Sequence, residues 1–271
     1  MMQNLSTIAA AALSCLKADS AAEKVRLTHN ASKAWFSNSL AFTFDHKAPA
    51  RPGRPLKPEL IAPQDMPRRR NAKARAARVA MLHAIAHIEL NAIDLAWDIV
   101  LRFGGDMPRE FTDDWIRVAD DEARHFDLLE HRLNEFDSFY GALPAHDGLW
   151  MSAENTAHDL CARLAIVPLV LEARGLDVTP AIIKKFEAAD DHATVEALET
   201  IYREEIDHVK AGTKWFKYQC DKQGLEEKKT YHHLVDTYFT GSLKPPFNID
   251  ARTQAGLSEA FYIPLSKLQK N

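Results

Sequence analysis

Glu122 and Glu205 each stand three residues before a histidine, in the segments "EARH" and "EEIDH". Of the 12 histidines in the chain, only His125 and His208 have an acidic residue at this spacing. Residues three apart lie on the same face of a helix, so each pair directs a carboxylate and an imidazole nitrogen toward one point. Such pairs on helices are typical of side chains that share a metal ion.

Both pairs lie among apolar residues, and two more glutamates lie on apolar stripes of other predicted helices. A single shift of 83 residues relates two sets of candidate ligands, which are Glu89, Glu122 and His125 in the first set and Glu172, Glu205 and His208 in the second. The sequence therefore predicts a repeated helix pair, with four Glu and two His meeting as the ligands of a dinuclear carboxylate site.

The expected burial of these carboxylates also indicates that a cation binds beside them. A buried carboxylate costs several kcal/mol unless a proton, a cation or a metal neutralises it (on the order of 3–5 kcal/mol for a broken buried pair). Carboxylate oxygens with two imidazoles suit iron, or manganese, better than zinc, so the predicted cofactor is two Fe ions, with Mn as the alternative. Ordinary salt-bridged helix faces would explain neither the apolar surroundings nor the matched shift.

The elements that must position these residues are all helical. Apolar residues at helical spacing predict helices over 71–103, from Thr112 or Asp113 to 138, over 152–174 and over 192–222. Gly175 is expected to end the third helix, and Pro180 to be the first residue of a further segment. No alternating pattern predicts a strand.

This pattern predicts an all-α fold, a four-helix bundle with additions at both ends. The expected parts are an N-terminal helical hairpin (1–46), a strap rich in Pro and Arg (47–70), the bundle (71–224) and an irregular C-terminal extension (225–271). Six prolines between 47 and 70 forbid a continuous helix in the strap.

Composition excludes several classes of protein. Hydrophobic residues make up 46% and charged residues 27% of 271 residues, with a net charge of −4, which is typical of a helix-rich globular protein with no obligate polyanion partner. Three separated cysteines provide no CxxC pair, so we expect neither a disulfide framework nor a rubredoxin-type iron, and a cytoplasmic location. We expect no signal peptide and no membrane span.

Several other residues admit two interpretations. His83 and His87 are expected to be packed or to support ligands rather than to bind metal, because their offsets from Glu89 do not place them beside it. Gly212 and Ala119 could leave space beside the metals or allow close helix packing, and Tyr202 is expected to be a hydrogen-bonded core residue rather than a redox side chain.

Several surface residues and segments also have two interpretations. Asp121 and Asp207 could orient ligands or be solvated. The basic stretch 51–78 could bind nucleic acid, but it lacks interleaved aromatic residues and is expected to be solvated and paired with acidic groups of the protein. The segment 243–257 is expected to be a long structured loop, where Lys244, Asn248 and Arg252 could line a substrate entrance.

From about residue 50 to 262 the chain resembles the ferritin-like superfamily, and within it a bacterial ferritin-like family of unknown function. The resemblance rests on "RPGRPLKPEL", "MPRRR", "HAIAHIELNAIDLAWD", "DDEARHFDLLEHRL", "YGALPAHDGLW", "CARLAIVPLVLEARGLDVTP", "EEIDHVKAGTKWF" and "LKPPFNIDARTQAGL". It implies a ferritin-like bundle and the same six metal ligands, but no particular reaction.

The expected function is that of a di-iron oxidoreductase, an O₂-dependent oxidase or hydroxylase of a small or nucleotide-bearing substrate with an external electron donor. The segments before 71 and after 224 suggest a covered site, unlike a bare storage bundle. The alternative is a ferritin-like protein that oxidises or handles iron without an organic substrate. A scaffold without metal is the third possibility.

Overall fold

The computed structural model describes residues 6–66 and 74–266. Within these ranges the protein contains helices, turns and three isolated β-bridges but no β-strand, which confirms the prediction of an all-α protein. The chain divides into two compact units, Met1–Trp150 and Met151–Asn271, and the short helix α5 (Gly148–Asn155) contains the boundary. This division falls inside the predicted 71–224 domain, and the predicted domain scheme stays a prediction.

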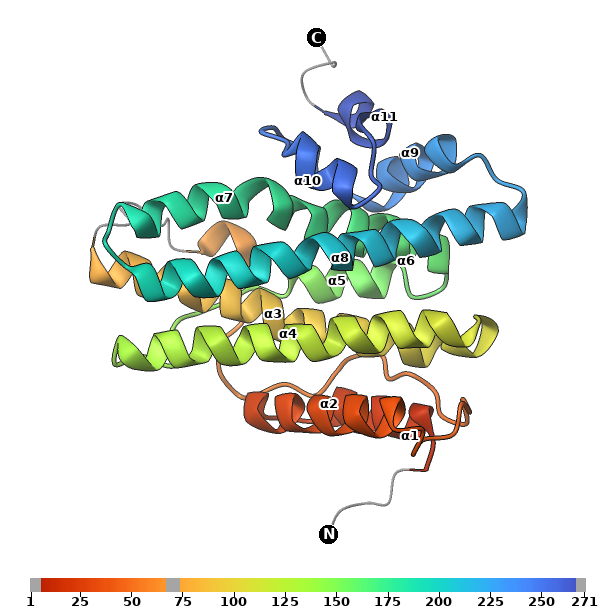
Figure 1. The fold of residues 1–271 in the computed structure, drawn as a ribbon, viewed down its shortest axis with the longest axis horizontal. Coiled ribbons are helices and arrows are strands. Elements are labelled where there is room, and N and C mark those ends of the chain that lie inside the picture. Colours follow the sequence, from red (N-terminus) through yellow and green to blue (C-terminus); the bar gives the residue numbers. More distant parts are fainter. Residues whose placement is uncertain (1–5, 67–73, 267–271) are drawn as a thin grey trace. The chain divides into compact units, whose positions relative to one another are not determined.

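The first unit is built on the antiparallel pair α3 (Arg75–Phe103) and α4 (Arg109–Glu135), joined by the turn η2 (Gly104–Asp106) (Figure 1). Pro108 is the N-cap residue of α4, so this helix begins three residues before the predicted Thr112. Gly104 is needed at the turn, because a Cβ there would lie 2.6 Å from the Phe44 ring.

α3 carries buried residues on nearly all of its faces, as expected of a helix in the core of a protein. By length and composition alone the stretch Arg75–Asp106 would be long and apolar enough to cross a membrane, and 67% of its most apolar window is buried within the protein. A buried core helix passes the same test, and we interpret α3 in that way.

A hairpin of α1 (Ile8–Lys17) and α2 (Ala21–Phe36) packs on α3 and α4, as Figure 1 shows for the red and orange helices. Thr7 and Ser20 cap the two helices with their side-chain oxygens. Indole hydrogen bonds join the layers, since Trp97 donates to Thr28 (3.0 Å) and Trp35 donates to Asp113 (2.7 Å). The predicted N-terminal helical hairpin is confirmed.

The strap from 47 to 66 is irregular apart from one short turn, η1 (Pro63–Asp65), as its prolines predict. Backbone contacts hold it on the first unit. The Gly53 amide donates to Leu16 O (2.7 Å), and the amides of Ile61 and Ala145 donate to Ala145 O and Glu59 O. A Cβ on Gly53 would meet Lys17 O at 2.4 Å, so only glycine allows this approach.

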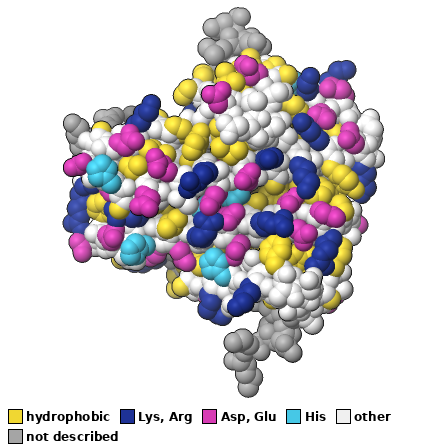
Figure 2. Space-filling view, in the orientation of Figure 1, with side chains coloured by type: hydrophobic (Ala, Val, Ile, Leu, Met, Phe, Trp, Pro, Cys, Tyr) yellow, Lys and Arg dark blue, Asp and Glu magenta, His cyan; other side chains and the backbone are white. Residues whose placement is uncertain are grey.

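The basic stretch lies partly outside the described residues, because Arg68, Arg69, Arg70 and Lys73 fall in 67–73. Of its other members, Arg51 pairs with Asp147, Arg75 pairs with Asp137 (2.6 Å), and the Arg78 guanidinium lies over the Phe136 ring. On the face shown in Figure 2, basic and acidic side chains are interspersed. The contacts of Arg51, Arg75 and Arg78 favour pairing within the protein, and binding of nucleic acid stays a prediction.

The second unit contains a long interrupted helix and its antiparallel partner, α8 (His192–Gln223). The interrupted helix consists of α6 (Leu160–Ile166), the π-helical segment η3 (Val167–Glu172) and α7 (Ala173–Glu187) (Figure 1). Gly224 has φ 68° and ends α8, where the sequence places the end of the last long helix.

The predicted helix over 152–174 is wrong at both ends. It begins at Leu160, because the Asp159 side chain caps the amides of Cys161 and Ala162, and it continues through Gly175 and Pro180. Pro180 has no N–H to donate to Leu176 O, four residues earlier. The side-chain Nδ2 of Asn248 donates to Leu176 O instead (3.2 Å), so the helix tolerates the proline.

The predicted irregular tail is largely helical. It contains α9 (Glu227–Tyr238), α10 (Ile249–Gln254) and α11 (Glu259–Tyr262), followed by the turn η4 (Ile263–Leu265). α10 lies inside the predicted loop 243–257, and the Asn248 side chain caps it. Arg252 of α10 forms a buried two-point ion pair with Asp177 of α7 (2.8 and 2.7 Å).

Candidate metal centre

In the first unit, Glu89 lies on α3, and Glu122 and His125 lie on α4. The amphipathic pattern of α4 turns Val118, Ala119 and the two candidate ligands inward on one face. All three candidate ligands are buried, with Glu89 4%, Glu122 1% and His125 0% exposed. The structure therefore brings together the first predicted set of ligands in the core of this unit.

The distances within this set leave room for an ion. His125 Nδ1 lies 3.5 Å from Glu89 Oε2 and 3.5 Å from Glu122 Oε2. These separations exceed those of ordinary N–H···O hydrogen bonds. One ligand atom from each residue lies within 4.8 Å of the others, and bonds of about 2.0–2.2 Å to a shared ion are compatible with that spread.

The electrostatics of the same cluster favour a cation. Burial raises the pKa of Glu89 well above its ordinary value, and the neighbouring Glu122 carboxylate raises this pKa further, whereas His125 lowers it. Two buried carboxylates beside one imidazole are therefore expected to hold a proton when no cation is bound. A metal ion in the cluster would replace that proton and neutralise the pair.

The second unit carries the matching set. Glu205 and His208 lie on α8, with Glu205 Oε1 3.5 Å from His208 Nδ1, and their side chains are 12% and 2% exposed. Glu172 is the last residue of η3, the π-helical segment, which packs against α8. Short π-helical segments occur frequently at functional sites, because the extra residue turns a side chain to a new direction.

Gly212 is explained by packing. A Cβ on Gly212 would lie 2.4 Å from Pro168 Cβ, so this glycine allows η3 to approach α8 closely. Of the two interpretations of Gly212, close helix packing is the one that the structure supports. Gly212 thereby fixes the segment that presents Glu172.

We expect Gly212→Ala to lower the free energy of unfolding by about 1–3 kcal/mol through overpacking, less any gain in helix propensity. The matched control is Gly175→Ala in α7, where a Cβ would meet nothing within 4 Å. That substitution should stabilise the protein by up to about 1 kcal/mol. Thermal unfolding of both variants measures the two effects, and equal shifts would contradict the role of Gly212.

His83 and His87 are packed histidines, as predicted, and both hold the loop that follows α4. The Gly141 amide donates to His83 Nε2 (2.9 Å). His87 lies between the Tyr140 hydroxyl at Nδ1 (2.8 Å) and His146 O at Nε2 (3.0 Å). Only Nε2 can donate to the carbonyl, so Nδ1 accepts from the tyrosine. Neither ring is oriented as a metal ligand.

The structure also shows the surroundings of Tyr202, Asp121, Asp207 and Arg252. The Tyr202 hydroxyl accepts from Asn248 Nδ2 (2.7 Å), as expected of a hydrogen-bonded core tyrosine. Asp121 pairs with Arg124 at the surface (2.5 Å), and Asp207 is exposed. Arg252 is buried in its ion pair with Asp177, so it is a structural residue of the second unit rather than part of an entrance. The pattern along the chain carries no signal for this pair, because its partners are 75 residues apart.

These observations define a class, an all-α protein with a buried carboxylate and histidine cluster that could bind a metal ion. The chain belongs to the family described as "Protein of unknown function (DUF455)", whose sequence model matches residues 17–263. An uncharacterized protein of Haemophilus influenzae is 44% identical to it over 211 residues, which cover 76% of this chain and 73% of the relative. No solved structure matches the chain.

Proposed function

We propose that this protein is a dinuclear iron carboxylate protein that uses O₂ to oxidise or hydroxylate an organic substrate. The observation that carries the proposal is the buried Glu89, Glu122 and His125 cluster, in which burial and the Glu122 carboxylate raise the pKa of Glu89. Ordinary core packing gives no reason to bury two acids beside each other.

The second set of ligands supports two ions rather than one. Glu172, Glu205 and His208 repeat the first set at a constant shift of 83 residues, and each unit presents its Glu-x-x-His pair on the second helix of its antiparallel pair. We propose that the two helix pairs assemble as a ferritin-like four-helix bundle around one centre. Four carboxylates and two imidazoles then share the positive charge of two divalent ions.

Iron fits this ligand set best. Carboxylate oxygens are hard ligands, and one imidazole per ion adds a borderline donor, which is the combination that iron and manganese accept and that a closed zinc site does not use. When bound, such a pair of ions supplies the electrons and the Lewis acidity for reaction with O₂.

The chain's own residues do the remaining work. The six ligands would hold the ions, and the apolar residues beside them, such as Val118 and Ala119 on α4, would exclude water from the centre. The three described cysteines are free and buried and form no CxxC pair, so electrons are expected to come from an external donor. A small or nucleotide-bearing substrate and a cytoplasmic location complete the proposal.

The test is metal analysis of protein reconstituted with iron under anaerobic conditions, followed by Mössbauer spectroscopy before and after exposure to O₂. Two irons per chain that oxidise together as a spin-coupled pair would support the proposal. Iron oxidation that continues far beyond two equivalents, with a cage-sized assembly, would instead identify a protein that stores or handles iron. Protein that binds no stoichiometric metal would contradict both.

A further inference from the structure

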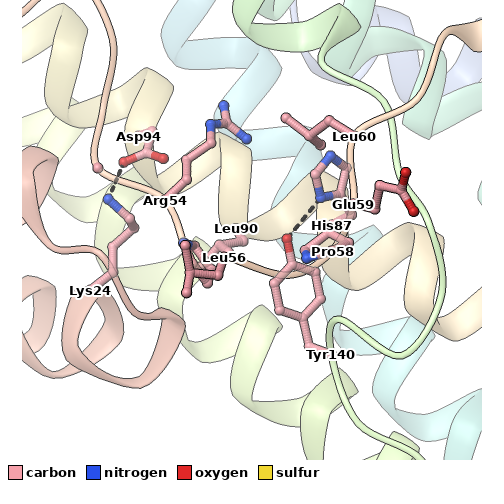
Figure 3. Close-up of a pocket in the computed structure, with 12 residues that line it drawn as sticks. Lys24, Arg54, Leu56, Pro58, Glu59, Leu60, His87, Leu90, Asp94 and Tyr140 are labelled. Carbon is pink, nitrogen blue, oxygen red and sulfur yellow. Dashed lines mark hydrogen bonds and ion pairs between the residues drawn. The ribbon is translucent and has the colours of Figure 1, made fainter.

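A cavity of about 210 Å³ lies in the first unit between the strap and α3 (Figure 3). Its strap wall contains Gly53, Arg54, Pro55, Leu56, Pro58, Glu59 and Leu60, and its α3 wall contains His87, Leu90 and Asp94; Lys24 and Tyr140 complete it. Figure 3 shows the carboxylate of the strap, Glu59, at the opposite end from Lys24. None of the candidate metal ligands lines this cavity. It is therefore a separate feature of the unit, which the proposed metal chemistry does not use.

Two cations reach the cavity, but only one of them is available to a ligand. Lys24 is fully buried and is held by Asp94 Oδ1 (2.5 Å) and by Cys15 O (3.0 Å). Figure 3 shows this pair at one end of the cavity. Because Lys24 and Asp94 neutralise each other, they contribute no net charge.

Arg54 is the other cation, and its hydrogen bonding is incomplete. Nη2 donates to Asn91 Oδ1 (2.6 Å) and lies 3.5 Å from Asp147 Oδ1, a carboxylate that Arg51 also binds. Its Nε is buried and donates to no group among the described residues. A buried guanidinium N–H without an acceptor is costly, and an anionic oxygen is its best partner.

The rest of the cavity suits an apolar body. Leu90 and the rings of Pro55 and Pro58 form apolar walls. The Tyr140 hydroxyl is hydrogen-bonded to His87. A dry cavity of about 150 Å³ can hold benzene, so this one admits an aromatic or aliphatic acid of about ten non-hydrogen atoms.

We propose that this cavity binds a small monocarboxylic acid, with the carboxylate on Arg54 and the apolar body against Leu90 and the strap prolines. Arg51 and Arg54 share the single carboxylate of Asp147, which leaves one positive charge to match the one negative charge of the acid. A phosphate dianion would require further donors, which the Lys24–Asp94 pair does not provide. This inference is independent of the metal centre, and metal-free protein should bind the acid equally well.

The experiment uses benzoate as the probe, with the full chain and saturation-transfer NMR titrations up to about 10 mM, a range suited to weak ligands. We expect saturable binding that Arg54→Gln weakens by about 10- to 100-fold, the range for one charge-assisted contact. Arg54→Lys should restore part of the affinity. The control Arg26→Gln changes an exposed arginine on α2 and should leave binding unchanged.

A second variant does not depend on Arg54, which also holds the strap. Leu90→Phe fills part of the cavity and should abolish benzoate binding while Arg54 keeps its contacts. Affinity unchanged in folded Arg54→Gln or Leu90→Phe protein, or no saturable binding to the parent protein, would overturn the proposal. Benzyl alcohol binding as tightly as benzoate, or inorganic phosphate displacing benzoate at equal concentration, would overturn the assignment of a carboxylic acid.

Discussion

Glu122→Ala is expected to remove most of the metal from the protein, and His208→Ala, in the other unit, is expected to do the same. Glu122 is 1% exposed and shares its cluster with Glu89 and His125, so no solvent or neighbouring side chain replaces the lost ligand. If the six ligands form one centre, either substitution breaks it. The double variant should then be little worse than either single variant.

Elemental analysis of reconstituted protein measures this effect, and the control is Asp121→Ala. Asp121 is adjacent to Glu122 but pairs with Arg124 at the surface, so its loss should leave the metal content unchanged. Glu122→Gln separates binding from folding. It should lose metal yet raise the stability of metal-free protein at neutral pH, because with a neutral amide at position 122 the cluster no longer has to take up a proton for the second carboxylate on folding. Full occupancy in both Glu122→Ala and His208→Ala would rule out the proposed centre.

The second large effect concerns folding of the second unit. Arg252→Met is expected to lower the free energy of unfolding by up to about 3–5 kcal/mol, because it removes the buried cation of the Asp177 carboxylate and leaves only the partly exposed Arg174, 3.4 Å away. Arg252 is 2% exposed, donates two hydrogen bonds to Asp177, and lies against the Phe247 and Tyr262 rings. Chemical denaturation with far-UV circular dichroism provides the measurement.

The comparison that tests this explanation is the double variant Arg252→Met with Asp177→Leu. Removing both charges should recover part of the stability that Arg252→Met loses, since no charge is then buried alone. Arg26→Met, which removes an exposed ion pair with Glu23, should change the stability by less than about 1 kcal/mol. A loss in the double variant equal to the sum of the single losses would contradict the buried-charge explanation.

The sequence was sufficient for the helical class and for the buried cluster of Glu89, Glu122 and His125 in the first unit. Helical periodicity and capping are local, so the ends of α8 and the break between α1 and α2 could be predicted. The pairing of Glu122 with His125 follows from helix geometry alone. Glu89 joined them because its apolar surroundings imply the same core, and the structure places it there.

The errors arise where distant residues decide local structure. Gly175 and Pro180 carry the ordinary signals for a helix end and a helix start, yet α7 runs through both because Asn248 satisfies the carbonyl that Pro180 cannot. The π-helical turn before Glu172 depends on contact between Pro168 and Gly212, 44 positions later in the chain, which no local pattern reveals. The cavity beneath the strap was missed for the same reason.

Because α7 is held by Asn248 and Arg252, the second unit can finish folding only after these later residues have been synthesised. Leu176 O and the Asp177 carboxylate acquire their partners 72 and 75 residues later in the sequence. At roughly 5–20 residues per second, synthesis of that interval takes about 4–15 s. During this time the helix that follows Glu172 lacks both C-terminal contacts, and Asp177 has only Arg174 as a cationic partner. Nascent second units are therefore completed only when the C-terminal segment emerges.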